Sequence, residues 1–180
     1  MKEAKKSFKV AFCGVMSALG VALLSLAGLI PILTYAAPMY VGLLIIPSMI
    51  EGGNAGAWCV WFVTGVLSAL ISPDKEATAF YLFVGYYPIV KSAFDKIKLK
   101  PVRIAVKLAF FTASIVVMYL LLIYLLRLES VIEEFREASM IINISGIVIM
   151  IAVMMVFDLL IDRMRILYVK KIRPKLRLRV

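Results

Sequence analysis

Six apolar stretches dominate the chain, each bounded by turn-forming or charged residues. They cover residues 8–30, 38–50, 55–71, 77–94, 104–126 and 140–161. A helix needs about 20 apolar residues to cross a bilayer, because the hydrocarbon core is about 30 Å thick. In lipid every backbone N–H and C=O needs a partner, and a helix pairs these groups within one segment. The sequence therefore predicts an all-α integral membrane protein with six transmembrane helices.

Composition leaves no room for a second, soluble domain. Of the 180 residues, 63% are hydrophobic and 18% are charged, whereas soluble domains are about 45–50% apolar and about 25% charged. We therefore expect residues 1–180 to form a single membrane domain. The stretch 38–50 is short for a full span and contains Pro47, so it either thins the bilayer locally or breaks at the proline.

The distribution of lysine and arginine along the chain indicates its orientation in the membrane, because the cytoplasmic loops of membrane proteins carry an excess of both residues. If the two termini are cytoplasmic, 18 of the 21 basic residues lie inside, and only Lys75, Arg127 and Arg136 lie outside. Six spans also place both ends on one side, so the N- and C-termini are predicted to be cytoplasmic. Orientation and attraction to anionic lipid account for the net charge of +10, and we expect no nucleic-acid partner.

Several kinds of catalytic and ion-coupling site are excluded by what the chain lacks. It has no histidine, and its two cysteines are Cys13 and Cys59. A zincin-type protease needs two histidines, nucleophilic hydrolases usually need a histidine base, and two cysteines alone do not complete a zinc site. Asp158 and Asp162 lie in the last turns of the sixth stretch, where snorkelling to the interface explains them. We expect no enzyme, metal site or cofactor.

One face of the first stretch is made of small residues. This small-residue stripe consists of Ala11, Gly14, Ala18 and Ala22. Spacings of three and four residues place all four on one helical face, and small residues let another helix backbone approach closely in lipid. The partner is either another helix of this chain or a separate protein. A second set, Gly65, Ser68 and Ser72, indicates internal packing.

Tyrosine and amide side chains gather in the predicted outer half of the membrane. These outer-half residues are Tyr35, Tyr81, Tyr119 and Asn143. A cavity lined by such groups can stack on and hydrogen-bond a planar, weakly polar molecule. An aromatic belt at the membrane interface is the alternative explanation for part of the tyrosines.

In layout the chain resembles the substrate-binding S component of an energy-coupling factor (ECF) transporter, the type that takes up vitamins in bacteria. The resemblance rests on six short spans, cytoplasmic termini, a basic loop after the fourth span and the small-residue stripe, where Gly14 replaces a usual alanine. It implies that the stripe docks on a T component driven by two ATPases. It also implies that the outer-half residues bind a vitamin-like ligand, and that the protein resides in the bacterial inner membrane.

Two other classes of protein fit the sequence. One is a structural membrane scaffold resembling the rod-shape-determining D proteins, which share this layout and bind partner proteins; a filled outer half would favour it. The other is a self-sufficient small transporter or channel. Such proteins use helices that are broken at glycine or proline. The only feature of the sequence that favours this class is the pair Gly85 and Pro88 in the fourth stretch.

Overall fold

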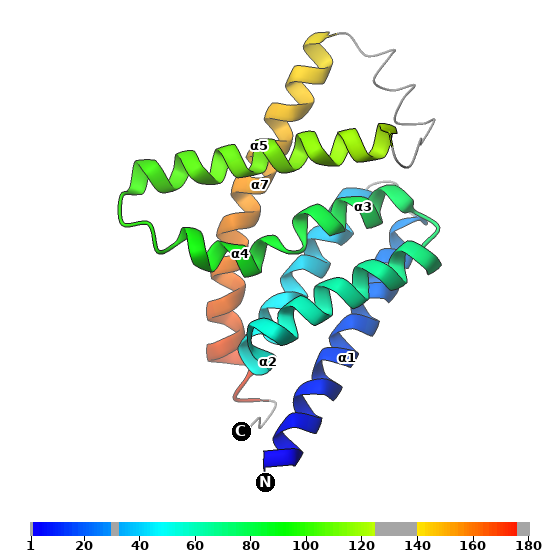
Figure 1. The fold of residues 1–180 in the computed structure, drawn as a ribbon, viewed down its shortest axis with the longest axis vertical. Helices are drawn as coiled ribbons and strands as arrows, with labels where there is room; N and C mark the ends of the chain where they lie inside the picture. The colour runs from blue at the N-terminus through cyan, green and yellow to red at the C-terminus, as the bar shows by residue number, and fades with distance from the viewer. Residues whose placement is uncertain (1, 30–32, 125–139, 176–180) are drawn as a thin grey trace. The chain divides into compact units, whose positions relative to one another are not determined.

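The structure is a computed structural model, and it describes residues 2–29, 33–124 and 140–175. All regular elements in these ranges are helical, as predicted (Figure 1). They are α1 (Lys2–Ala27), α2 (Leu33–Ile71), α3 (Lys75–Val84), α4 (Tyr87–Phe94), α5 (Lys100–Tyr124), α7 (Met140–Leu167) and a π-helical turn, η1 (Tyr168–Ile172).

The chain divides into two compact units. The first unit comprises Met1–Lys91 and Leu159–Val180, and the second comprises Ser92–Asp158. The boundaries fall within α4 and α7. The first unit therefore holds α1, α2, α3 and the C-terminal part of α7, while the second holds α5 and the rest of α7.

Three helical segments among the described residues are long and apolar enough to cross a membrane. They are Lys6–Ala27, Leu33–Ile71 and Pro101–Met118. This agrees with a membrane protein of the all-α class. The count of six spans and the cytoplasmic placement of the termini stay predictions.

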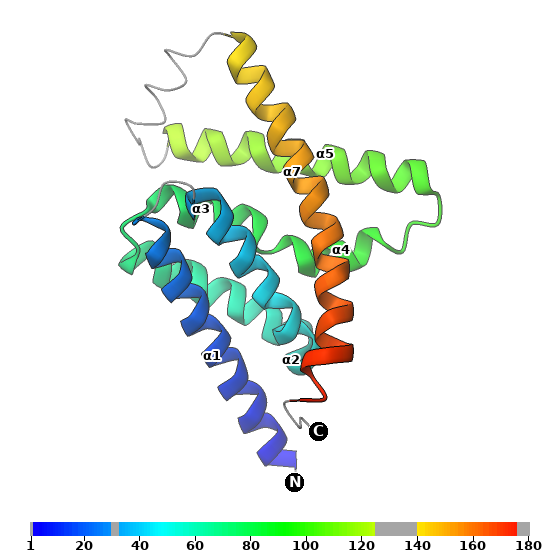
Figure 2. The same ribbon diagram turned by 180° about the vertical axis from the view of Figure 1, so that it is seen from behind.

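The helix α1 packs along α2 through one continuous face. That face consists of the buried residues Cys13, Ser17, Gly20, Leu24 and Ala27, which repeat every three or four positions. Gly20 lies at the closest approach, since a Cβ there would lie 2.9 Å from Thr64 Cγ2 and 3.0 Å from Val41 Cγ1. Figures 1 and 2 show α1 beside α2 from both sides. A side chain at residue 20 would push the two helices apart.

The helix α2 turns back on itself at Gly53, which separates a first arm from a second arm (Figure 1). Gly53 has φ 76° and ψ −174°, a region that only glycine occupies without strain. The reversal falls between the predicted stretches 38–50 and 55–71. The short stretch 38–50 is therefore the greater part of a first arm that begins at Leu33, and Pro47 lies within it without ending it.

Hydrogen bonds fix the connection between α2 and α3. The carboxylate of Asp74 caps α3 by accepting the Ala77 N–H at 2.8 Å, and it also accepts the Thr34 hydroxyl at 2.8 Å. The Ser72 hydroxyl donates to the carbonyl of Leu24 at 3.1 Å. This connection therefore joins the end of α1, the start of α2 and the start of α3.

The fourth apolar stretch, expected as one span over 77–94, forms the two short helices α3 and α4. Pro88 has no N–H to donate and disfavours helical geometry at the residue before it. Gly85 ends α3, its N–H donating to the Tyr81 carbonyl at 2.7 Å. A helix interrupted at Gly85 and Tyr86 therefore replaces the expected continuous one.

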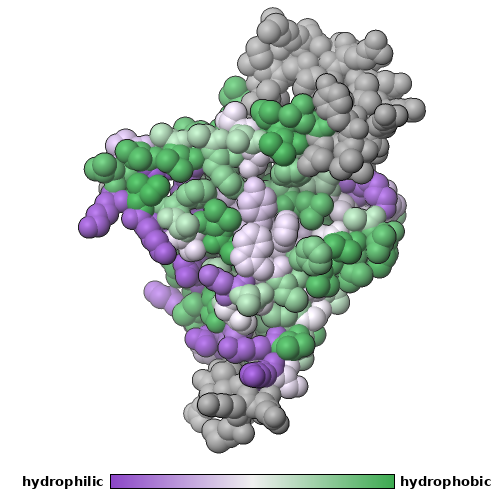
Figure 3. Space-filling model, viewed as in Figure 1, coloured by the Kyte–Doolittle hydropathy of each residue, from purple (hydrophilic) through white to green (hydrophobic). Residues whose placement is uncertain are grey.

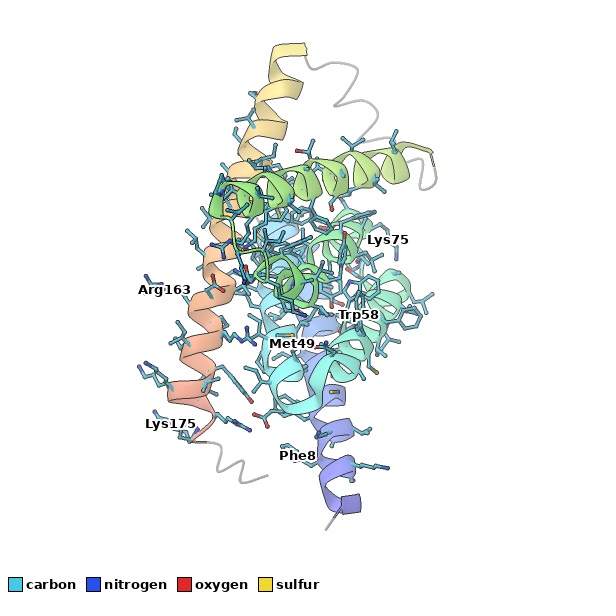
Figure 4. All side chains as sticks on the ribbon, turned by 60° about the vertical axis from the view of Figure 1, so that its left-hand side comes forward. Phe8, Met49, Trp58, Lys75, Arg163 and Lys175 are labelled. Atoms are coloured by element: carbon cyan, nitrogen blue, oxygen red, sulfur yellow. The ribbon has the colours of Figure 1, made fainter. Side chains whose placement is uncertain are left out.

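The start of α1 and the end of α7 lie at the same end of the first unit. Phe8 and Lys175 lie at one end of it and Lys75 at the other (Figure 4). Exposed lysines at the first end include Lys6, Lys9 and Lys175. Hydrophilic residues gather at this end on the face drawn in Figure 3. The start of α1 and the end of α7 thus share one polar end.

Gly53 and Gly14 give a matched pair of substitutions. Gly53→Ala forces an alanine into a glycine-only conformation and should lower the free energy of unfolding by about 1–3 kcal/mol. Gly14→Ala adds a Cβ that meets nothing within 4 Å. It should raise the free energy of unfolding by about 0.5–1 kcal/mol, because alanine favours a helix. Thermal unfolding in detergent measures both. Equal effects would contradict the assigned reversal at Gly53.

Candidate functional site

The small-residue stripe lies on the outside of the first unit. Ala11, Gly14, Ala18 and Ala22 are all exposed. At 100° per residue, the stripe lies nearly opposite the face of α1 that packs on α2. Its partner is therefore not α2. The second set of small residues, Gly65, Ser68 and Ser72, is buried as predicted.

Tyr35, an outer-half residue, stands at the start of α2 beside α3. Its hydroxyl donates to Glu76 Oε1 at 2.6 Å, and its ring meets the Phe80 ring edge-on with centroids 5.8 Å apart. The ring remains 45% exposed. Tyr35 is thus held in place by α3 while part of its surface stays accessible.

Tyr81 lies in the core of the first unit, with no exposed surface. A Cβ on Gly65 would lie 3.9 Å from the Tyr81 ring, so α3 packs directly on the second arm of α2. Thr64 and Ser68, one turn apart on that arm, are also fully buried. Within the described part of the chain, the hydroxyls of Tyr81, Thr64 and Ser68 form no hydrogen bond of standard geometry, and Thr64 is the polar neighbour of the Tyr81 hydroxyl. We call these three the buried hydroxyls.

Tyr119 and Asn143 belong to the second unit, on α5 and on the first turn of α7. Their side chains lie outside the described residues. Their part in a binding pocket therefore stays a prediction.

The hydroxyl of Thr64 can be tested against the bonded one of Ser72. Thr64→Val keeps the shape and removes a hydroxyl that forms no hydrogen bond of standard geometry among the described residues, so the free energy of unfolding should stay unchanged or rise by about 1 kcal/mol. Ser72→Ala removes the bond to the Leu24 carbonyl and should lower it by about 1 kcal/mol. Chemical unfolding in detergent checks both, and a larger loss for Thr64→Val would contradict this assignment.

Ion pairs connect charged residues of α2, α4, α7 and the end of η1 within the first unit. Glu51, just before the reversal of α2, is buried and accepts a bond from Arg173 Nε at 2.9 Å. Lys91 is also buried and pairs with Asp162 at 2.9 Å. Snorkelling alone was expected for Asp162. The lysine partner could not be read from the sequence, because it comes from a segment about 70 residues away.

A similar bridge holds the second unit. Lys107 on α5 contacts Asp95 at 3.0 Å and Asp158 on α7 at 3.0 Å. Its side chain is only 12% exposed. In the same unit, the rings of Phe94 and Phe110 pack on each other with centroids 5.1 Å apart. Two carboxylates therefore neutralise one nearly buried ammonium, which explains how charged residues sit among apolar helices.

Tyr168 in η1 completes the group around Glu51. Its hydroxyl donates to Glu51 Oε1 at 3.5 Å. Burial of the phenol and the neighbouring Glu51 carboxylate raise the pKa of Tyr168 from 10.0 to about 12. The neutral phenol is thus favoured in the folded protein.

This pKa shift makes stability depend on alkaline pH. Because the folded pKa is raised, the contribution of Tyr168 is fully present below pH 10 and is lost as the pH rises through about 12. Tyr168→Phe should be less stable than wild type by about 1 kcal/mol at pH 8. The difference should shrink between pH 10 and pH 12 in thermal unfolding. A difference that stays constant would rule out the bond to Glu51.

A cavity of about 380 Å³ lies between α1 and the second arm of α2. Its walls include Cys13 and Gly14 from α1, and Gly52, Gly56 and Cys59 from α2. Both cysteines are free thiols. This cavity was not predicted from the sequence, because Gly52 and Gly56 are brought together only by the reversal of α2 at Gly53. Among the described residues, no three metal-binding side chains of histidine, cysteine, aspartate or glutamate gather.

No protein-family model matches the chain, and neither a curated protein nor a solved structure matches it. The features of the chain that bear on function are therefore the exposed stripe, the buried groups and the layout of the helices.

Proposed function

We propose that this protein is the substrate-capturing membrane subunit of an ECF-type importer. In this proposal it binds a vitamin-like small molecule from the outer side of a bacterial inner membrane. A T component and two ATPases then supply the energy. The chain itself needs only a pocket, a docking face and a lipid-compatible exterior.

The exposed small-residue stripe is the observation that carries this proposal. A stripe used for packing within the first unit would be buried, as Gly20 and Leu24 are. Instead the stripe is exposed over three turns of α1, and a Cβ on Gly14 would meet nothing within 4 Å. Small residues allow backbones to approach closely, which is a main source of helix association in lipid. The stripe is thus suited to receive a helix of another protein.

Ligand binding is assigned to the outer-half residues. Tyr35 offers an accessible ring whose hydroxyl is already fixed by Glu76, and a fixed ring loses little entropy when a planar molecule stacks on it. Tyr81 supplies a buried hydroxyl that forms no hydrogen bond of standard geometry with the described residues. Asn143 and Tyr119 remain in the proposed pocket on their sequence positions alone.

A structural scaffold remains the second candidate, and one observation favours it. Tyr81 is fully buried among protein side chains, so this part of the outer half is filled. A scaffold would use the same exposed stripe to bind cell-wall or division proteins. The two candidates therefore differ in the partner and in the presence of a small ligand.

Substitution within the stripe tests docking. Ala18→Leu places a bulky side chain on the exposed face and should leave the thermal stability of the isolated protein within about 0.5 kcal/mol. Recovery of the T component and ATPases with the tagged protein, purified from its own host, should fall at least tenfold. That loss corresponds to about 1.4 kcal/mol of docking free energy.

Two variants control for folding and for surface changes as such. Ala69→Leu makes the same change at an exposed position of α2 and should keep the partners. Gly20→Leu enters the packed face of α1 and should unfold the protein, because its Cβ alone would lie 2.9 Å from Thr64. If Ala18→Leu unfolds the protein or keeps its partners, the stripe is not a docking face.

A further inference from the structure

The cavity between α1 and α2 is an open apolar groove. It exists because the residues that face each other are small: Gly14 and Ser17 on α1, and Gly52, Ala55 and Gly56 on α2. The Cys13 side chain packs against Gly52 and Gly56 at the bottom of the groove. A Cβ added to either glycine would lie 3.1 Å from Cys13 Sγ. Exposed residues among its walls open it to the surface. In a membrane, such a groove faces lipid.

Positive charge marks one end of this groove. Lys9 is the only charged residue among the ten that line it. Lys6, also exposed, precedes it by three residues and Cys13 follows it by four, so all three share a helical face. Glu51, beside the groove residue Gly52, is neutralised by Arg173. The groove therefore combines an apolar trough with a basic end.

The size of the groove fits a single hydrocarbon chain. At about 30 Å³ for a water-sized group, 380 Å³ holds about a dozen such groups, which is close to one acyl chain. A helix about 10 Å across occupies roughly 400 Å³ for each turn of 5.4 Å. A partner helix would therefore place no more than about the volume of one turn inside the groove and would lie mostly outside it.

We propose that this groove is a binding site for an anionic phospholipid. One acyl chain lies along Cys13, Gly52 and Gly56, and the ammonium groups of Lys6 and Lys9 hold the phosphate. The site is distinct from the outer-half residues, and from the small-residue stripe except for Gly14. It does not depend on the proposed importer function.

Native mass spectrometry of the full chain in detergent tests the site, with phosphatidylglycerol and phosphatidylcholine as probes. The wild type should bind one phosphatidylglycerol at least tenfold more tightly than phosphatidylcholine. Lys6→Gln together with Lys9→Gln should remove this preference, because each basic residue near an anionic surface contributes about fivefold. Ala55→Leu, which fills the groove from an exposed position, should weaken the binding of both lipids.

Matched controls and a second measurement keep the test decisive. Lys98→Gln and Ala113→Leu make the same changes at exposed positions outside the groove and should leave lipid binding unchanged. Cys59 lines the groove, so its alkylation by N-ethylmaleimide should be at least threefold slower in phosphatidylglycerol vesicles than in phosphatidylcholine vesicles. This readout needs no variant to fold.

Three results would overturn the proposal. Equal affinity for the two lipids would remove the phosphate site, and full binding to Ala55→Leu would place the lipid elsewhere. Efficient cross-linking of Cys59 to a co-purified membrane subunit, with no lipid retained, would assign the groove to a protein helix instead.

Discussion

Close contact between α1 and α2 is the interaction on which the first unit depends. Lipid tails are as apolar as leucine side chains, so helices in a bilayer associate through close packing more than through burial from water. Gly20 permits this packing, because the Thr64 and Val41 side chains occupy the space where its Cβ would lie. Because the face of α1 that contains Gly20 packs on α2, the opposite face of α1 points away from α2. The exposure of the small-residue stripe is thus a consequence of how α1 packs.

Hydropathy and backbone chemistry were sufficient to predict most of the helical elements. The apolar stretches coincide with α1, the two arms of α2, α5 and α7, and the reversal falls at the Gly-rich segment that separates the second and third stretches. The burial of Gly65, Ser68 and Ser72 was predictable because their spacing places them on one face. The sequence showed Gly85 close to Pro88. It did not show that the helix would end there and that α3 and α4 would form separately.

Other features depend on contacts between distant segments and could not be read from the sequence. The first stretch carries two faces rich in small residues, and only the position of α2 decides that Cys13, Ser17 and Gly20 are buried. From the sequence, Asp158 and Asp162 near the end of α7 were predicted to snorkel to the membrane interface. In the structure, each of them pairs with a lysine. Burying an ionised group without a partner is costly, so these pairs explain why the chain tolerates charge there.

Native mass spectrometry of the protein, purified gently from its own host, tests the central claim most directly. One spectrum reports both small molecules and subunits bound to the 20.1 kDa chain. The importer account predicts a small planar ligand together with a second membrane subunit and an ATPase pair. A ligand-free chain attached to cell-wall or division proteins would contradict it and identify a scaffold.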